Sequence, residues 1–256
     1  MKAMYIEAII IGCVTGFISA FFGIGGSSID TPLLRIFLHL PPYLALASPL
    51  PAALLTTLVA LLTYWKKQLV DFRVFRWSIL GGLPGMILGA SLSRFFSGQI
   101  LMLITAGVLF LVGVNFILKK LTASGKEIKK GYRVVPAAYI TGAVFVLSAL
   151  SGILANGGGL FLIPAYVLLF RMEMKKAIAT SLLTVGVMIL PAYLIHYRLG
   201  HIDPSVSSAM ALGVIPMAYL GAKLDLKTKS STIQLLFGLM LVVFSVYFFA
   251  SQLKIS

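Results

Sequence analysis

The sequence has few charged residues, fewer acidic ones and almost no cysteine. Only 11% of the 256 residues are charged, and Asp and Glu together number 7. The single Cys13 excludes an intrachain disulfide, and His39, His196 and His201 are too scattered for a metal-binding motif. A nucleophile elbow and a clustered carboxylate pair are also missing from the sequence, so neither an enzyme nor a cofactor is expected.

Apolar residues are the majority of the chain. They account for 59% of the chain, and the mean hydropathy of +1.02 lies far above that of globular proteins. The net charge of +14 could point to nucleic acid, but the basic residues lie between apolar runs rather than on one polar face. A lipid bilayer is therefore the expected environment, and nucleic acid is not an expected partner.

Ten apolar segments are visible along the chain. A helix needs about 20 apolar residues to cross a bilayer. Eight segments approach this length and two are shorter; the long ones are 4–22, 43–65, 74–95, 98–118, 134–154, 176–197, 205–223 and 231–253, and the short ones are 28–40 and 158–170. The sequence therefore predicts an all-α polytopic membrane protein with eight long and two short segments.

The two halves of the chain repeat each other at an offset of 132 positions. Gly25-Gly26-Ser27 ahead of Pro32 recurs as Gly157-Gly158-Gly159 ahead of Pro164. The same offset relates further residues, which are Asp71 and Asp203, Gly81 and Gly213, Pro84 and Pro216, and Gly89 and Gly221. We expect a first transmembrane repeat over 1–120, a basic cytoplasmic linker over 121–133 and a second repeat over 134–256. Each repeat would hold four long helices and one short helix after a glycine-rich break.

Charge distribution indicates how the halves are oriented. If the short segments cross the bilayer, each half has five crossings and the halves are inverted; if they re-enter, the halves are parallel. Ten crossings place 16 of the 21 basic residues on one side, whereas eight crossings split them 13 against 8. Because basic loops stay in the cytoplasm, the sequence favours inverted repeats in a cytoplasmic (inner) membrane with both termini outside.

The glycine breaks are the first candidate binding site. Unwound backbone at membrane depth persists only where protein buries it or where it lines a wet cavity. Glycine N–H groups beside a new helix N-terminus form a cradle for anions. The candidate ligands are Gly25, Gly26, Ser27, Ser28 and Thr31 in the first half, and Asn156, Gly157, Gly158 and Gly159 in the second. The alternative is that the glycines only allow close helix packing, which suits Gly81, Gly85 and Gly89 well.

Hydroxyl residues near the start of an apolar helix form a second candidate group. Ala47-Ser48-Pro49 in the first half matches Thr180-Ser181-Leu182 in the second if one residue of slippage is allowed. Ser48, Thr180 and Ser181 are predicted either to cap or pack the helix or to contact substrate.

Ionisable residues inside apolar segments are candidates for charge balance or proton coupling, because they are expensive in lipid. They are Asp30, Arg35 and His196. Arg35 has three open interpretations: pairing with Asp30, countering an anion, or reaching the outer surface. Asp71 and Asp203 have the sequence context of helix starts.

At the glycine breaks the chain resembles the TauE/SafE family of sulfite and organosulfonate exporters, also called TSUP permeases. The residues that carry the likeness are Gly16, Ser19, Gly23, Gly25, Gly26, Pro32, Ser151, Gly152, Gly157, Gly158, Gly159, Pro164, Thr180 and Ser181. The resemblance implies secondary transport of sulfur-containing anions across a prokaryotic cytoplasmic membrane. Ser27, where a third glycine is typical, and Ala155-Asn156 depart from the pattern within the cradle, which bears on the identity of the anion.

The predicted function is secondary transport of sulfite, thiosulfate or an organosulfonate by alternating access around the two breaks. An anion channel, or a transporter of another organic anion such as a carboxylate, is the alternative. The expected partners are a small anion, the lipid bilayer and, for coupling, a proton. The sequence leaves the oligomeric state open.

Overall fold

A computed structural model describes residues 2–25, 27–95, 98–122, 135–153 and 158–253. Within these ranges the chain is helical and contains no strand. The helices of the first half are α1 (Lys2–Phe22), α2 (Ser27–Phe37), α3 (Pro42–Ala47), α4 (Leu50–Trp65), α5 (Phe72–Leu92) and α6 (Gly98–Thr122), with a 3-10 turn η1 at Ser93–Phe95. Those of the second half are α7 (Ala137–Ile153), α8 (Gly159–Pro164), the π-helical turn η2 (Ala165–Leu169), α9 (Met174–Arg198), α10 (Pro204–Lys227) and α11 (Ser230–Leu253).

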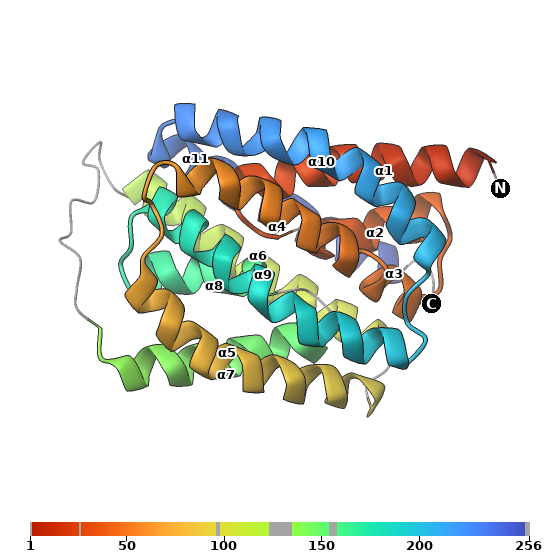
Figure 1. The fold of residues 1–256 in the computed structure, drawn as a ribbon, viewed down its shortest axis with the longest axis horizontal. Helices are drawn as coiled ribbons and strands as arrows, with labels where there is room; N and C mark the ends of the chain where they lie inside the picture. Colours follow the sequence, from red (N-terminus) through yellow and green to blue (C-terminus); the bar gives the residue numbers. More distant parts are fainter. Residues whose placement is uncertain (1, 26, 96–97, 123–134, 154–157, 254–256) are drawn as a thin grey trace.

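The elements follow the predicted segments closely. Each half has a long helix, a break, a short helical stretch and then the remaining long helices (Figure 1). One difference lies in the segment predicted over 43–65, which is interrupted where α3 ends and α4 begins, at Ser48 and Pro49. Its counterpart α9 runs without a break because no proline stands at the matching position, which is Ser181.

Five described helical stretches are long and apolar enough to cross a membrane. They are Met4–Phe22, Pro42–Trp65, Met174–Arg198, Pro204–Lys227 and Ser230–Tyr247. Shorter apolar stretches lie at Ala106–Leu118, Ala137–Ile153 and Gly159–Leu169. The chain is thus a polytopic membrane protein, while the count of eight long and two short segments stays a prediction.

The surface of the bundle is apolar and its interior holds hydroxyl groups. Leu111 on α6 is 71% exposed, and Leu62, Leu212 and Val243 are exposed on α4, α10 and α11. Serines and threonines such as Ser48 and Thr184 are buried instead. An exposed apolar surface this extensive indicates contact with lipid, because in lipid the apolar side chains avoid the free-energy cost of contact with water.

The two halves exchange packing partners. α1 packs along α10 and α7 packs along α5, while α4 and α9 pack against each other. Small residues make these approaches close: a Cβ atom at Gly213 or Gly221 would overlap the α1 backbone, and one at Gly81, Gly85 or Gly89 would overlap the α7 backbone. The packing interpretation of Gly81, Gly85 and Gly89 is therefore confirmed.

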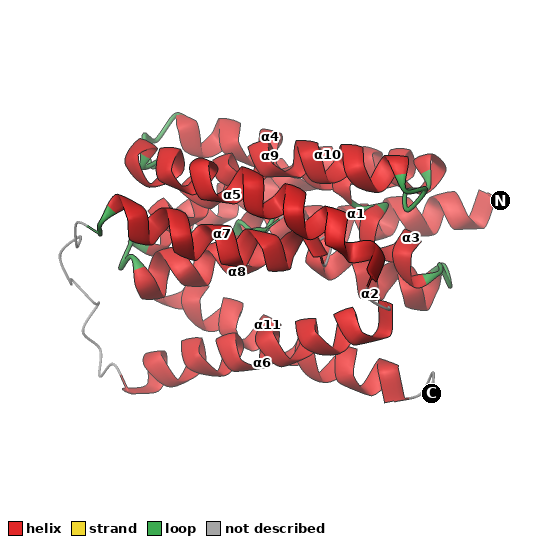
Figure 2. Cartoon of the chain, turned by 90° about the horizontal axis from the view of Figure 1, so that it is seen from below, coloured by secondary structure: helices red, strands yellow, loops and turns green. Residues whose placement is uncertain are grey.

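α6 and α11 form a pair along one side of the bundle (Figure 2). Gly113 on α6 and Gly238 on α11 face each other where the two helices cross. Phe237 of α11 connects the pair to the rest of the bundle, because its ring lies 5.5 Å from that of Phe22 on α1.

Two ends of the bundle can be distinguished by their side chains. At what we call the basic end, the Arg73 guanidinium donates to the Val135 carbonyl oxygen (3.2 Å) and the Lys175 ammonium to the Leu226 carbonyl oxygen (2.9 Å). At the opposite end, the histidine end, α9 finishes near His196 and α10 begins after Asp203. α4 and α10 both run toward the basic end, and α5 and α9 run away from it (Figure 1).

Candidate functional site

The first glycine break begins where α1 ends. Gly23 adopts a left-handed conformation (φ 72°), and the Ile24 N–H donates to the Ser19 carbonyl oxygen (3.0 Å). This is the geometry with which a left-handed glycine closes a helix C-terminus. Gly25 is left-handed as well (φ 83°), so the backbone turns twice before α2 begins at Ser27.

α9 holds this break in place. The Ser181 hydroxyl donates to the Gly23 carbonyl oxygen (2.9 Å). A Cβ atom at Gly23 would lie 2.6 Å from Ile178 Cγ2, and one at Gly25 would lie 2.6 Å from Val185 Cγ1. Residues with a Cβ atom would therefore meet both a conformational and a steric penalty at these two positions.

The second break also contains a left-handed glycine. Gly158 is left-handed (φ 99°) and serves as the N-cap of α8, where its carbonyl oxygen accepts hydrogen bonds from the Phe161 and Leu162 N–H groups. A Cβ atom there would lie 3.2 Å from Met188 Cε and 3.7 Å from Met86 Cε. A new helix thus starts after each break, as predicted, with its first N–H groups free of helical partners.

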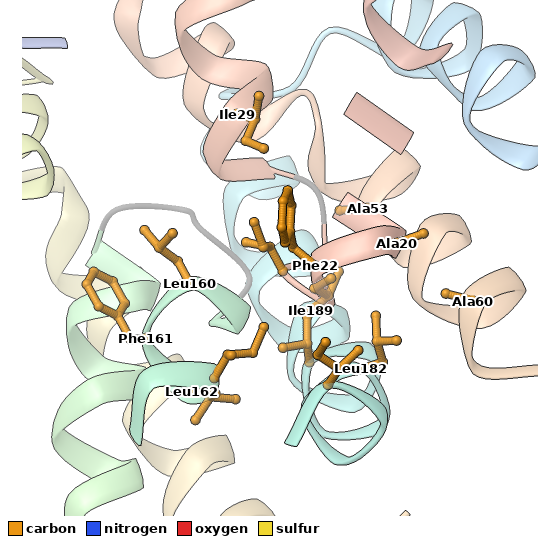
Figure 3. Close-up of a cluster of buried hydrophobic side chains, with 14 of the residues drawn as sticks. Ala20, Phe22, Ile29, Ala53, Ala60, Leu160, Phe161, Leu162, Leu182 and Ile189 are labelled. Carbon is orange, nitrogen blue, oxygen red and sulfur yellow. The ribbon is translucent and has the colours of Figure 1, made fainter. Parts of the chain in front are cut away.

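The two breaks meet inside the bundle. A Cβ atom at Gly159 would overlap the carbonyl oxygen and carbon of Ile24, so the start of α8 lies directly on the backbone of the first break. Figure 3 shows a cluster of buried apolar side chains from both halves, with Phe22 and Ile29 from the first half and Leu160 and Leu162 from the second. Leu182 and Ile189 of α9 lie beside them (Figure 3).

Several predicted ligands lie outside the described residues. Gly26, Asn156 and Gly157 are among them. Ser27 and Ser28 form the first turn of α2, but their side chains are outside the description too. Thr31 is described and buried on the same helix.

Ser48 and Thr180 perform matching roles at opposite ends of the bundle. The Ser48 hydroxyl oxygen accepts from the Asp203 N–H, and the Thr180 hydroxyl oxygen accepts from the Asp71 N–H, each at 2.9 Å. Both pairs keep the offset of 132, so the predicted slippage of one residue is wrong: Ser48 matches Thr180, and Ser181 has no hydroxyl counterpart at Pro49. The slippage had aligned the letters of a local motif, whereas backbone contacts between the halves set the true register.

Asp71 and Asp203 are the helix starts that their sequence context predicts. The Asp71 carboxylate accepts from the Arg73 and Val74 N–H groups, and the Asp203 carboxylate accepts from the Ser205 and Val206 N–H groups. They cap α5 and α10 respectively.

Two of the three ionisable candidates, Asp30 and Arg35, lie on α2, and the third, His196, lies on α9. Asp30 is buried on α2, faces the Thr15 hydroxyl of α1, and has one carboxylate oxygen without a hydrogen-bond partner among the described residues. Arg35 is half-buried near the end of α2. At the histidine end, His196 Nδ1 lies 3.2 Å from His201 Nδ1, and the His201 ring stacks on Tyr43 at 4.7 Å. Burial lowers the pKa of His201, which lies in the connection between α9 and α10.

Two serines at the breaks were missing from the predicted ligands. Ser19 and Ser151 are fully buried, and neither hydroxyl has a hydrogen-bond partner within the described part of the chain. Each stands near the end of the first helix of its half, just ahead of the break, and the two are 132 positions apart. That offset is the signal by which the sequence could have identified them.

A family model of sulfite exporters, "Sulfite exporter TauE/SafE", matches residues 8–248. The chain belongs to the TauE/SafE family. It is a membrane transporter by this membership, and its relatives carry the same description. "Probable membrane transporter protein YunE" of Bacillus subtilis is 24% identical over 93% of this chain and 95% of its own length. A "Probable membrane transporter protein" of Xylella fastidiosa is 29% identical over 95% of this chain and 96% of its own.

A third relative, "Probable membrane transporter protein YjnA" of Bacillus subtilis, is 22% identical over 94% of this chain and 98% of its own length. No solved structure matches the chain. The TauE/SafE match over residues 8–248 includes both glycine breaks, which therefore lie within a transporter family's shared sequence.

Proposed function

We propose that this TauE/SafE protein is a secondary transporter of a small sulfur-containing anion, namely sulfite, thiosulfate or an organosulfonate. The observation that carries the proposal is the contact of the two glycine breaks, in which Gly159 lies on the backbone of Ile24. Binding sites built from facing discontinuous helices, one from each half, are the arrangement by which many transporters hold substrate near the bilayer centre.

The donors around this contact suit an oxyanion. α2 and α8 begin at the breaks, and the N-terminus of a helix carries partial positive charge and free N–H groups. The hydroxyls of Ser19 and Ser151, buried and without a hydrogen-bond partner in the described parts of the chain, would add one donor from each half. A small tetrahedral or pyramidal oxyanion has several oxygen atoms, which could accept hydrogen bonds from these donors at the same time.

Alternating access would move one half against the other around the breaks. The counterpart pairs α4 and α9, and α5 and α10, run in opposite directions along the bundle, which supports inverted repeats of four long helices and one short helix each. The concentration of basic residues at the basic end supports its placement in the cytoplasm, with both termini outside an inner membrane.

The remaining predicted ligands take more than one role in this proposal. Gly25, Gly158 and Gly159 shape the cradle, with Gly26, Ser27, Ser28, Thr31, Asn156 and Gly157 beside them in sequence. Ser48, Thr180 and Ser181 bond to backbone groups of the opposite helices or break, so we assign them to positioning. Asp30, Arg35 and His196 stay candidates for charge balance or coupling.

The test begins with the purified protein and a thermal-shift screen against sulfite, thiosulfate, sulfate, sulfonates and carboxylates. A sulfur oxyanion should raise the melting temperature, whereas stabilisation by carboxylates alone would contradict the substrate class. Accumulation of the anion in proteoliposomes against its gradient, abolished by a protonophore, separates a transporter from a channel.

Ser19→Ala combined with Ser151→Ala tests the cradle itself. A hydrogen bond to a charged group contributes about 1.5–3 kcal/mol, so each lost hydroxyl should weaken anion binding by about 10- to 150-fold. Ser93→Ala is the control, because the Ser93 hydroxyl is buried but donates to the Ala90 carbonyl oxygen, three residues earlier in α5. Equal anion affinity in the double variant and the control would refute this cradle.

A further inference from the structure

A carboxyl group outside the glycine breaks is buried near the basic end of α10. Asp225 is an acidic residue, yet its side chain is completely buried in the bundle. Its Oδ2 atom accepts a hydrogen bond from the Tyr64 hydroxyl (2.6 Å), and its Oδ1 atom has no hydrogen-bond partner among the described residues. A buried carboxylate that is only half satisfied is unfavourable for folding, and inside membranes such groups are retained for function.

Each helix around Asp225 presents a different group to it. α4 contributes Tyr64, and α9 contributes Lys175, whose positive charge attracts the carboxylate while its ammonium donates to the Leu226 carbonyl oxygen. α1 approaches Gly221, one turn earlier on α10, with its own backbone at Phe17 and Phe21. Lys223 and Lys227 flank Asp225 on α10 itself, and Lys229 follows the helix.

This cluster joins the two halves of the protein. Tyr64 belongs to the first half, and Asp225 and Lys175 belong to the second. In the repeat, Tyr64 corresponds to His196 and Asp225 corresponds to Ser93, each pair 132 positions apart. The carboxyl group therefore has no counterpart at the histidine end. By contrast, Asp30 on α2 faces Thr15 on α1, which belongs to the same half.

We propose that Asp225 is the proton-binding site that couples anion movement to a pH gradient. When ionised, it accepts the Tyr64 hydrogen bond with charge assistance and, together with Lys175, holds α4, α9 and α10 together, which closes the basic end. When protonated, it loses the attraction of Lys175 and the charge-assisted bond, so α4 can separate from α10. The inference rests on the proposed function as a secondary transporter, and it identifies the group that would carry the coupling proton.

Proteoliposomes of the full chain with radiolabelled sulfite separate coupling from transport. In wild type, a pH gradient should drive sulfite accumulation, and counterflow exchange should proceed without a gradient. Asp225→Asn should keep exchange and lose gradient-driven accumulation. Glu173→Gln is the matched control, since Glu173 is an exposed acidic residue at the same end whose side chain makes no cap bond, and it should behave as wild type.

Accumulation that persists in Asp225→Asn, or that is lost in Asp30→Asn instead, would overturn the proposal. Asp225→Glu keeps a carboxyl group and should keep accumulation with a shifted pH dependence, which covers the case in which the Asn variant does not fold. Infrared titration gives a reading without transport: the protonated-carboxyl band that appears on acidification of wild type should contain a component that is missing from Asp225→Asn. Identical bands in the two proteins refute the proton site, whereas a component that depends on Asp225 without any sulfite transport refutes the proposed function alone.

Discussion

Gly159→Ala tests whether the contact between the breaks is needed. The added Cβ atom would overlap the carbonyl oxygen and carbon of Ile24 and lie 2.9 Å from its Cα atom. Because these are backbone atoms within a turn fixed by Gly23 and Gly25, no side-chain rotation relieves the overlap. The two breaks must therefore move apart.

The magnitude follows from two opposing effects. Alanine in place of glycine inside a helix usually stabilises by roughly 0.5–1 kcal/mol. Overpacking in a well-filled interior costs about 1–3 kcal/mol. The control is Gly142→Ala on α7, where a Cβ atom would meet no heavy atom within 4 Å. Because both variants gain the helical preference of alanine, Gly159→Ala should unfold with a free energy about 1–3 kcal/mol lower than Gly142→Ala.

Thermal unfolding in detergent and anion binding measure the two consequences. At about 2–4 °C per kcal/mol for a chain of this size, the melting temperatures of the two variants should differ by several degrees. Anion affinity should fall in Gly159→Ala and stay at the wild-type value in Gly142→Ala. Identical melting temperatures and affinities in both variants would show that the breaks do not depend on their contact, and the cradle would lose its basis.

Three further outcomes follow from the contacts described above. Asp71→Ala and Asp203→Ala should each lower the free energy of unfolding by about 0.5–2 kcal/mol through loss of an N-cap, measured by thermal unfolding; a loss at only one site would contradict the matched roles. Tyr64→Phe should lower it by about 1–3 kcal/mol by removing the hydrogen-bond donor to Asp225, and an unchanged melting temperature would speak against their bond. Because burial lowers the pKa of His201, the folded state binds its proton less readily than the unfolded chain, so stability should fall as the pH drops below about 6.5. His201→Gln should reduce that dependence of the melting temperature on pH, and an equal slope in both proteins would exclude His201 as its source.

The length of the apolar runs was enough to predict the helices, and the offset of 132 was the basis for predicting the repeat. Asp71 and Asp203 could be identified as helix starts because capping depends on residues two and three positions away, which the sequence displays directly. The positions of the breaks were predictable for the same local reason, since consecutive glycines disfavour a helix wherever they occur.

Contacts between side chains and distant backbone groups depend on which helices pack together, and this cannot be predicted from local sequence. The partners of Ser48 and Thr180 are backbone N–H groups in the opposite half, 155 and 109 positions away. A local alignment therefore misplaced their register by one residue. Asp225 was not among the candidates from the sequence, because its partner Tyr64 lies 161 positions away on α4.

By itself, the sequence determined the membrane environment, the helical class and the places where helices break, because each follows from composition or from neighbours within a few turns. It also predicted the two repeats from the offset of 132. Only the tertiary structure decided that Gly159 lies against Ile24, that Ser19 and Ser151 are buried without a hydrogen-bond partner among the described residues, and that Asp225 of the second half bonds to Tyr64 of the first. These are contacts between distant segments, and they are set by how the helices of one half pack against those of the other.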